Sequence, residues 1–336
     1  MEYYLGVDVG ASFIRIGVIG EDGSVVDKVK VPVPEEGSED TIAQIILNRA
    51  KSDLGKYLGS IRAVGVGSIG PLDLKVGNVI IAPNLKWRVK RFRLYAPLRQ
   101  GFNLPVVIGN DAMASVWGEY LFGYGVGKRN VVYVTLSTGI GMGVIVDGNL
   151  LVGKDGNAHE MGHAVIDFEA DLQCGCGRYG HLEAFAGGGN MPKAARWYLE
   201  KRYRGPMTPL AELVKNGKAT TPDLFKGYRD GDAFGREFIE FVLKALAAGL
   251  ANVINAYDPE VMVLGGSVFL NNSDIILDGL RRYLDRYAVA RLPEILGTRF
   301  GDDIGIIGAA ALAIRIPESL KPFIEMQERA FKSGSA

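Results

Sequence analysis

The stretch GVDVGASFIRIGVIGEDGSVV at residues 6–26 and the stretch YVTLSTGIGMGVIVDGNLLV at residues 133–152 have the same order of elements. Each begins with residues typical of a β-strand, breaks at a turn rich in Gly, Ser and Thr, and continues through a second strand, a Gly-containing turn and a third strand. Few residues are identical between the two stretches. The shared order nevertheless predicts two related α/β halves.

Further elements follow each stretch. Short apolar runs predict buried strands at 61–67, about 79–82, 105–109, 261–264 and 294–296. Helical periodicity predicts helices at about 41–57, 112–122, 233–257, 274–288 and 304–316. The segment 187–232 is polar and contains several prolines, and its pattern does not decide between structures. At 336 residues the chain suits two domains.

Composition excludes several classes of protein. Lys plus Arg equals Asp plus Glu at 38 each, so no global basic field points to nucleic acid. No apolar run is long enough to span a bilayer, and the start MEYYLGVDVG does not have the pattern of a secretory signal. Two Cys in a chain of this size do not make a disulfide framework. The default expectation is a cytoplasmic protein without a nucleic-acid or membrane partner.

Three glycine-rich turns follow apolar strands, at 8–12, 136–143 and 265–267. Glycine allows backbone N–H groups to converge on an anion, and neighbouring hydroxyls can reach phosphate oxygens. Any one of these turns alone is typical of an ordinary hairpin. Because two of the three lie inside the repeated unit, phosphate binding is favoured. The stretch 148–155 resembles a P-loop but ends in Asp155, and no G-x-G-x-x-G opens a helix after the first strand, so both of those motifs are rejected.

A carboxylate stands where a strand gives way to a helix, in Gly109-Asn110-Asp111-Ala112. Asp111 could be a helix N-cap or a catalytic base at the mouth of a cleft, since a base must lie within hydrogen-bond reach of its proton. Further polar groups lie upstream at Asn84 and downstream at Glu160, His163 and Glu183. Amide, carboxylate and imidazole groups together suit a sugar, which offers a ring of hydroxyls.

All three His and both Cys of the chain lie in HEMGHAVIDFEADLQCGCGRYGH, residues 159–181. A metal site, an active site and chance are three explanations that the stretch alone leaves open.

These motifs together resemble the ROK family of sugar kinases and transcriptional repressors, within the actin-like ATPase superfold. The resemblance covers almost the whole chain. It rests on DVGAS (8–12), GSIGP (67–71), NLKW (84–87), NDA (110–112), LSTGIGMG (136–143), EMGH (160–163), CGCGRYGHLE (174–183) and NAYDP (255–259) followed by VLGGSV (263–268).

The resemblance implies an α/β protein with the actin-like ATPase (ribonuclease H-like) fold, two α/β lobes with a cleft between them. The expected small lobe comprises residues 1–112 plus about 304–336, and the expected large lobe comprises residues 113–303. The family's activity would be ATP-dependent phosphorylation of the 6-hydroxyl of a hexose, most simply glucose. Hexose and ATP are then the partners, Mg²⁺ is a cofactor, and a homo-oligomer is expected because relatives are commonly dimers or tetramers.

The resemblance also implies the site residues, with Asp111 as the general base. The sugar would be held by Gly70, Asn84, Asn110, Asp111, Glu160, His163 and Glu183. The nucleotide and its phosphates would be bound by Asp8, Gly10, Ala11, Ser12, Thr138, Gly139, Gly265 and Gly266. Asp8 would hold Mg²⁺, directly or through water.

The chain departs from the family pattern in two regions. In the first turn Ala11 and Ser12 stand where Gly and Thr are usual, and Phe13 stands where Lys is usual. In the cysteine motif the third Cys is replaced by His181. Zn²⁺ accepts both thiolate and imidazole, so the implied structural zinc site is His163, Cys174, Cys176 and His181. The alternative is a metal-free loop, and His159 has no role in either.

Other functions within the family remain open. A kinase for fructose, mannose or N-acetylmannosamine would share the motifs, because fold does not fix the substrate. A sugar-sensing transcriptional regulator is a further alternative. It is disfavoured by the neutral charge and by a first phosphate turn at Asp8, which leaves no room for an N-terminal helix-turn-helix domain.

Overall fold

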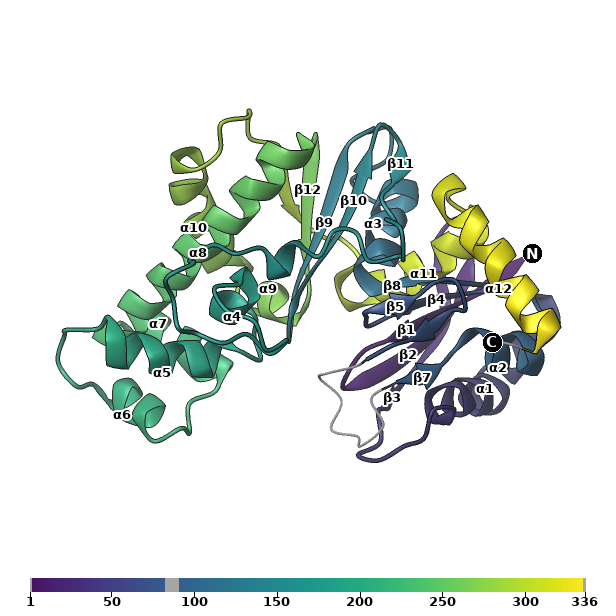
Figure 1. Cartoon of the computed structure of the whole chain (residues 1–336), viewed down its shortest axis with the longest axis horizontal. Helices are drawn as coiled ribbons and strands as arrows, with labels where there is room; N and C mark the ends of the chain where they lie inside the picture. The colour runs from purple at the N-terminus through teal and green to yellow at the C-terminus, as the bar shows by residue number, and fades with distance from the viewer. Residues whose placement is uncertain (1, 82–90, 335–336) are drawn as a thin grey trace. The chain divides into compact units, whose positions relative to one another are not determined.

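The computed structural model describes residues 2–81 and 91–334, and the chain forms two compact units (Figure 1). The first unit comprises Met1–Tyr133, Met142–His159 and Thr298–Ala336, and the second comprises Val134–Gly141 and Glu160–Gly297. Compared with the expected small lobe, the first unit also includes residues 113–133, 142–159 and 298–303.

Two five-stranded sheets carry the repeat seen in the sequence. Their strand orders are β3-β2-β1-β4-β8 and β11-β10-β9-β12-β13, so each places its third, second, first, fourth and fifth strands in the same sequence. The strands are β1 Tyr3–Val9, β2 Phe13–Gly20, β3 Val25–Pro32, β4 Ile61–Ser68, β8 Val106–Asn110, β9 Val131–Leu136, β10 Ile140–Val146, β11 Asn149–Leu150, β12 Val261–Gly265 and β13 Glu294–Gly297. The matching orders confirm the prediction of two related α/β halves.

Parallel pairing sets the functional edge of the first sheet. β1 pairs antiparallel with β2 but parallel with β4, and β4 pairs parallel with β8. The carboxyl ends of β1, β4 and β8 therefore meet at one edge, where ligands bind in open α/β sheets. The side chains of β1 and β4 that face the sheet's core are apolar and buried, including Leu5, Val7 and Val64.

Helix α11 (Ile304–Ile314) packs directly on this sheet because small residues line the contact on both sides. A Cβ at Gly6 would lie 2.0 Å from the Ile306 carbonyl oxygen, and a Cβ at Gly65 would lie 1.8 Å from that of Ala309. The same helix crosses α3 (Asp111–Phe122) closely, since a Cβ at Gly118 would lie 2.8 Å from the Gly308 Cα. The alanines and glycines of the 304–316 segment thus allow close approach of helix to sheet.

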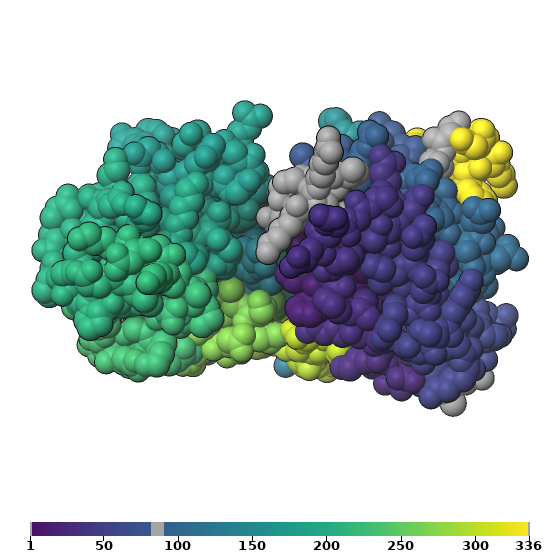
Figure 2. Space-filling view, turned by 90° about the horizontal axis from the view of Figure 1, so that it is seen from below, coloured from purple at the N-terminus to yellow at the C-terminus, as the bar shows by residue number. Residues whose placement is uncertain are grey.

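The first unit contains elements that the sequence did not predict. They are α2 Tyr95–Phe102, α12 Lys321–Ser333 and the strands β5 Leu72–Asp73 and β7 Phe92–Arg93, which form a small sheet with β6 Asn78–Val79. Of the strand predicted at about 79–82, β6 includes Val79, and residue 82 lies outside the described residues. Helix α1 (Thr41–Asp53) is shorter than expected and continues as a 3-10 segment, Gly55–Ser60. In Figure 2 the yellow C-terminal segment lies against the blue and purple N-terminal part of the same unit. There the Gln327 side chain donates to the Leu74 carbonyl at 2.7 Å.

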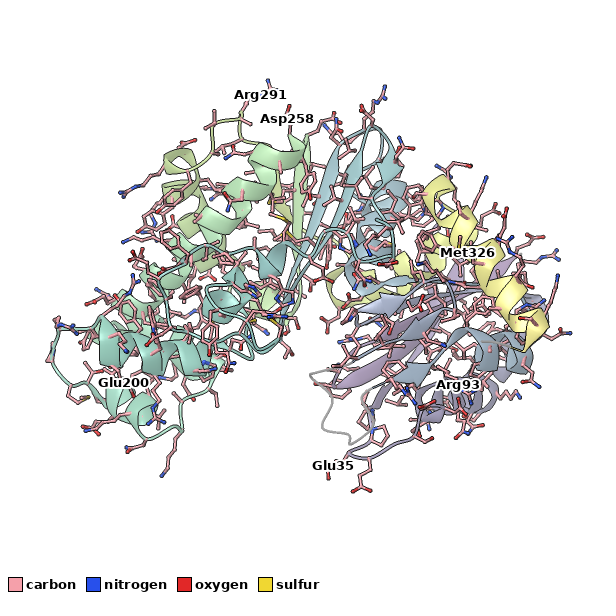
Figure 3. The ribbon with its side chains drawn as sticks, viewed as in Figure 1. Glu35, Arg93, Glu200, Asp258, Arg291 and Met326 are labelled. Carbon is pink, nitrogen blue, oxygen red and sulfur yellow. The ribbon has the colours of Figure 1, made fainter. Side chains whose placement is uncertain are left out.

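The second unit is mainly helical around its part of the second sheet. Its helices are α4 Leu182–Ala186, α5 Met191–Lys201, α6 Pro209–Lys215, α7 Thr221–Asp230, α8 Ala233–Tyr257, α9 Ser267–Asn271 and α10 Ser273–Tyr283. The undecided segment 187–232 is therefore helical, with Thr208 and Thr220 as N-caps of α6 and α7. Helix α8 ends as expected at Asp258, whose left-handed φ of 42° stops it; Figure 3 labels this residue and Glu200 on α5.

Candidate active site

Asp8 lies at the end of β1, just before the first glycine turn. Its side chain is 13% exposed, and Arg15 Nη1 donates to Asp8 Oδ2 at 3.0 Å. A Cβ at Gly305, in the first turn of α11, would lie 2.6 Å from the same oxygen. Burial raises the pKa of Asp8 above its ordinary value, and the Arg15 charge offsets only part of this rise. The carboxylate thus faces a cation and a helix N-terminus, both of which favour its ionised form.

The loop of residues 67–71, which the family resemblance assigns to the sugar, begins at the end of β4 beside the end of β8. Ser68 is in register with Val9 on one side and with Asn110 on the other. A Cβ at Gly70 would lie 3.6 Å from Asn110 Nδ2, so this loop lies against the Asn110 amide. The parallel edge therefore brings Asp8, Gly70, Asn110 and Asp111 to one end of the sheet.

Asn110, and not Asp111, is the N-cap of α3. The Asn110 Oδ1 accepts hydrogen bonds from the backbone N–H groups of Ala112 at 3.0 Å and Met113 at 3.3 Å. Asp111 is the first residue of the helix, and its Oδ1 accepts from the Ala112 N–H at 2.8 Å. Because the amide of Asn110 satisfies the helix end, an Asp at 111 is not needed as the cap.

The second glycine turn, residues 137–139, is tied to Glu183 on α4. The backbone N–H of Ile140 donates to Glu183 Oε2 at 2.8 Å. A Cβ at Gly139 would lie 2.5 Å from that oxygen, so Gly139 lies directly against the carboxylate. The loop after α4 also follows the turn, since Gly188 and Gly189 donate to the carbonyls of Ser137 and Thr138, each at 2.8 Å.

The third glycine turn abuts the second. Gly266 has a φ of 87°, and a Cβ there would lie 2.5 Å from the Leu136 carbonyl oxygen. Beyond it, the hydroxyls of Ser137 and Ser267 lie 3.1 Å apart. Gly265 and Gly266 are therefore held beside the end of β9, next to Thr138 and Gly139 as the sequence predicted for one site.

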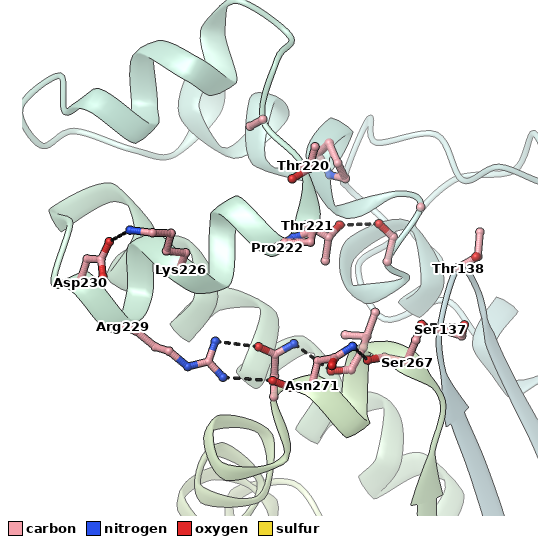
Figure 4. Close-up of a pocket in the computed structure, with 16 residues that line it drawn as sticks. Ser137, Thr138, Thr220, Thr221, Pro222, Lys226, Arg229, Asp230, Ser267 and Asn271 are labelled. Carbon is pink, nitrogen blue, oxygen red and sulfur yellow. Dashed lines mark hydrogen bonds and ion pairs between the residues drawn. The ribbon is translucent and has the colours of Figure 1, made fainter. Parts of the chain in front are cut away.

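A cavity of about 860 Å³ opens beside these two turns, entirely within the second unit (Figure 4). Ser137, Thr138, Ser267 and Val268 contribute one part of its wall. The rest comes from the loop after α4, from the start of α5, and from α7, α9 and the residues next to them: Gly188, Gly189, Pro192, Ala219, Thr220, Thr221, Pro222, Lys226, Arg229, Asp230, Asn271 and Asn272. A cavity of this size suits a ligand as large as a nucleotide.

The charged residues of this cavity are held by neighbours. Lys226 forms an ion pair with Asp230, and Arg229 Nη1 donates to Asn272 Oδ1 at 2.9 Å. The Thr221 hydroxyl donates to the Gly188 carbonyl at 2.6 Å. These α7 and α9 residues were missed from the sequence; the capping box of Thr220 and Asp223 was the available signal for a helix start there.

Glu160 and His163 face each other at the 3-10 turn Met161–His163. Glu160 Oε2 lies 3.9 Å from His163 Nε2. Partial burial raises the pKa of Glu160, the His163 charge lowers it, and the charge of Glu183 raises it further. Gly162 between them packs on β10, where a Cβ would lie 2.0 Å from the Ile140 carbonyl oxygen.

The two His and two Cys of the predicted zinc site converge. One ligand atom from each of His163, Cys174, Cys176 and His181 lies within 4.8 Å of all the others. Cys174 Sγ is 3.9 Å from His163 Nδ1, and Cys176 Sγ is 3.3 Å from His181 Nδ1. A tetrahedral zinc with bonds of about 2.0–2.3 Å needs ligand atoms roughly 3.3–3.8 Å apart. The thiolate and imidazole donors are of the kinds that zinc binds, and the widest pair would have to close by up to about 1 Å.

His159, which had no role in the sequence analysis, is buried at 7% exposure. Its backbone is left-handed, with a φ of 69°, and its ring is hydrogen-bonded to the backbone of Met142 on β10. Burial lowers its pKa from 6.5 to about 4, so the ring is neutral at physiological pH. His159 is not among the residues of the converging metal cluster.

Among the described residues, the structure has no helix long and apolar enough to cross a membrane. Asn84, expected in the sugar site, lies outside the described residues.

Comparison with known proteins identifies the family. The sequence model of the ROK family matches residues 4–316. The chain belongs to the ROK family. A glucokinase from Pyrobaculum calidifontis is 46% identical over 328 residues, which cover 96% of this chain and 99% of that protein.

Solved structures of ROK proteins are similar over almost the whole chain. A ROK family glucokinase from Streptomyces griseus, in complex with glucose and AMPPNP, superposes with a TM-score of 0.71 at 30% identity, covering 92% of this chain and 98% of that one. A ROK hexokinase from Thermus thermophilus gives a TM-score of 0.74 at 30% identity, covering 92% and 97%. These similarities confirm the resemblance drawn from the motifs and the actin-like ATPase fold it implied.

Proposed function

We propose that this ROK protein is an ATP-dependent hexose kinase that phosphorylates the 6-hydroxyl of glucose. Glucokinase is the name of its 46% identical relative, and the similar Streptomyces griseus enzyme was solved with glucose and AMPPNP. The observation that carries the proposal is that Asn110, and not the adjacent Asp111, caps helix α3. Because Asn110 caps α3, the carboxylate beside it at the ligand-binding edge of the sheet can serve as a base.

In this mechanism Asp111 accepts the proton of the sugar 6-hydroxyl. The hydroxyl oxygen then bonds to the γ-phosphorus of ATP, and the bond from that phosphorus to the bridging oxygen breaks, so that ADP leaves. The other sugar hydroxyls would be held by Gly70, Asn84, Asn110, Glu160, His163 and Glu183. Phosphoryl transfer requires little beyond such positioning and charge neutralisation.

The nucleotide would occupy the 860 Å³ cavity, with its phosphates toward the glycine turns. Thr138, Gly139, Gly265 and Gly266 lie at or beside its wall and offer backbone N–H groups, while Gly10, Ala11 and Ser12 form the turn after Asp8. Mg²⁺, when bound, neutralises the phosphate charge. Asp8, which forms an ion pair with Arg15, would supply the oxygen ligand that Mg²⁺ prefers.

Zinc would be bound by His163, Cys174, Cys176 and His181, where it would stabilise the loop without taking part in the reaction. His163 would then use Nδ1 toward the metal, and its Nε2 would remain toward Glu160 and the sugar. Such a link fixes the orientation of the ring.

Fructose, mannose or N-acetylmannosamine as acceptor, and a sugar-sensing regulator without catalysis, are the alternatives that the same experiment separates. A cytoplasmic location, expected from the composition, and a homo-oligomeric state, expected from the family resemblance, stay predictions.

The test is an ADP-release assay over a panel of these hexoses with wild type, Asp111→Asn and the control Asp22→Asn. Asp22 is an exposed turn residue that accepts from the Ser24 N–H at 3.0 Å, a contact that Asn can keep. We expect wild type and the control to phosphorylate glucose best, and Asp111→Asn to lose about 10²–10⁴-fold in kcat. Near-normal turnover by Asp111→Asn would refute the assignment of Asp111 as the general base. Absence of wild-type activity with every hexose would refute the proposed kinase activity.

A further inference from the structure

Asn157 forms a two-point contact with the backbone of Leu72. The Leu72 N–H donates to Asn157 Oδ1 at 3.0 Å, and Asn157 Nδ2 donates to the Leu72 carbonyl at 2.8 Å. The side-chain amide therefore pairs with one residue as a neighbouring strand would. Both residues belong to the first unit, although 85 positions separate them in the sequence.

The residues on either side extend this contact. Lys75 Nζ lies 3.0 Å from Asp155 Oδ1, and a Cβ at Gly156 would lie 2.4 Å from the Leu74 side chain. The segment 155–157 thus lies along the segment 72–75 over several residues. Of these contacts the Lys75–Asp155 ion pair is exposed and contributes little, so the amide of Asn157 is the specific link.

Leu72 directly follows the sugar-side loop, residues 67–71. A Cβ at Gly70 would lie 3.4 Å from the Leu72 nitrogen, 3.6 Å from Asn110 Nδ2 and 3.9 Å from Asn157 Oδ1. Gly70 is therefore enclosed by two amides, one from the end of β8 and one from Asn157. On its other side, Ile69 donates to the Val9 carbonyl at 3.0 Å.

We propose that Asn157 is a positioning residue for the acceptor sugar, holding the loop 67–71 against Asn110 through the backbone of Leu72. Gly70 in this loop and Asn110 at the end of β8 are both proposed to contact the sugar. This proposal rests on the proposed function. It adds a residue that need not touch the sugar and that acts through the geometry of Leu72.

The variants are Asn157→Asp and Asn157→Ala, with Asn149→Asp as the matched control. Asn149 is an exposed Asn of the same unit whose Nδ2 donates to the Asp147 carbonyl at 3.1 Å, so the control adds the same charge away from Leu72. At pH 8 the new carboxylate of Asn157→Asp cannot donate to the Leu72 carbonyl. We expect both variants to raise KM for glucose about tenfold, with KM for MgATP within about twofold and the control unchanged.

A pH series separates positioning from a general loss of structure. When protonated, the carboxylic acid introduced by Asn157→Asp has one donor and one acceptor and can restore both contacts with Leu72. Because the ordinary pKa of Asp is about 3.9, the KM for glucose of Asn157→Asp, divided by that of wild type at the same pH, should fall about threefold between pH 8 and about pH 4.5. The same ratio for Asn157→Ala should stay constant, because alanine has no proton to regain.

Three results would overturn the proposal: a wild-type KM for glucose in both variants, an equal rise in KM for both substrates, or a pH-independent ratio for Asn157→Asp. Should Asn157→Ala fail to fold, the Asn157→Asp variant at the two pH values still decides. A wild-type enzyme inactive on every hexose would instead reject the proposed function, and a wild-type enzyme active with unaffected Asn157 variants would reject this proposal alone.

Discussion

The first glycine turn, residues 10–12, and the second, residues 137–139, each connect two neighbouring strands of a five-stranded sheet. They obtain their carboxylates differently. The first has Asp8 on its own strand, and Arg15 on the following strand pairs with it at 3.0 Å. The second has Thr135 at the corresponding position, and its carboxylate comes from Glu183, which accepts from Ile140 at 2.8 Å.

The difference assigns separate tasks to two copies of one architecture. A buried carboxylate balanced by an arginine at the first turn suits a cation and phosphate charge. At the second turn Glu183 also lies near the metal cluster, with Cys174 Sγ 3.6 Å from Glu183 Oε1. The second turn is thus coupled through Glu183 to the loop that carries the proposed zinc.

The largest expected effect comes from a substitution at Asp8, compared with one at Thr135, which occupies the corresponding position before the second turn. Asp8→Asn removes the charge that would hold Mg²⁺ and leaves Arg15 without its partner. We expect kcat/KM for MgATP to fall about 100-fold or more. Thr135→Val should change it by less than about threefold, because no charge is lost. Steady-state kinetics over a range of Mg²⁺ concentrations measure both, and equal losses in the two variants would contradict separate tasks for the turns.

The first turn was predictable from the sequence because its parts are local. Asp8, the glycine and the following hairpin occur within a few residues, and strand alternation places them at a sheet edge. The repeat also predicted the architecture of the second turn. It could not predict the Glu183 contact, since that depends on α4 being packed against the turn from more than 40 positions away.

The misses have the same physical origin. Helix α12 and the small sheet β5-β6-β7 are stabilised by tertiary contacts such as Gln327 to the Leu74 carbonyl. The cavity residues of α7 were missed although Thr220 and Asp223 form a capping box, because the surrounding prolines obscured the helical pattern. Four separate metal-ligand residues were predicted as one set only through the family resemblance.

The second expected effect concerns the strand that leaves each turn. Gly17 on β2 and Gly143 on β10 both lie beneath a helix, but their neighbours differ. A Cβ at Gly143 would lie 2.2 Å from the Ala112 backbone oxygen, whereas a Cβ at Gly17 would lie 2.7 Å from the terminal methyl of Ile306. A side-chain end can rotate away and a backbone cannot. We expect Gly143→Ala to destabilise by about 3 kcal/mol and Gly17→Ala by about 1 kcal/mol.

Thermal melts of the two alanine variants, followed by circular dichroism, measure this difference. If Gly17→Ala proved the more damaging, α11 would be held more rigidly on the first sheet than its contacts indicate.

Removing the proposed zinc should disturb the loop that Glu183 connects to the second turn, and with it His163. We expect His181→Ala to carry less than about 0.1 equivalent of zinc and to raise KM for glucose about tenfold, through loss of the support for His163. Arg178→Ala is the control, since this exposed residue lies in the same loop outside the ligand set. Elemental analysis of untagged protein gives the metal content. A His181→Ala protein with a full equivalent of zinc would remove His181 from the site.

The smallest expected effect concerns a polar side chain that bonds to, or lies on, the strand after each turn, β2 or β10. On β2 this group is Arg15, whose charge is permanent, and on β10 it is His159, whose ring bonds to Met142 and titrates. The folded-state pKa of His159 is depressed from 6.5 to about 4, so its stabilising contribution is complete above pH 6.5 and is lost as pH falls toward 4. Between pH 8 and pH 5.5 this loss amounts to about 1 kcal/mol, roughly 2 °C in Tm.

The variant that tests this is His159→Asn, because Asn tolerates the left-handed φ and can donate to a carbonyl without titrating. Over that pH range the Tm of His159→Asn should fall by about 2 °C less than the Tm of wild type. His163 and His181 are present in both proteins and cancel in the comparison. If the Tm of the two proteins fell equally with pH, the loss of stability in acid would not come from His159. The contact of His159 with Met142 on β10 would then be as independent of pH as the Arg15 contact on β2.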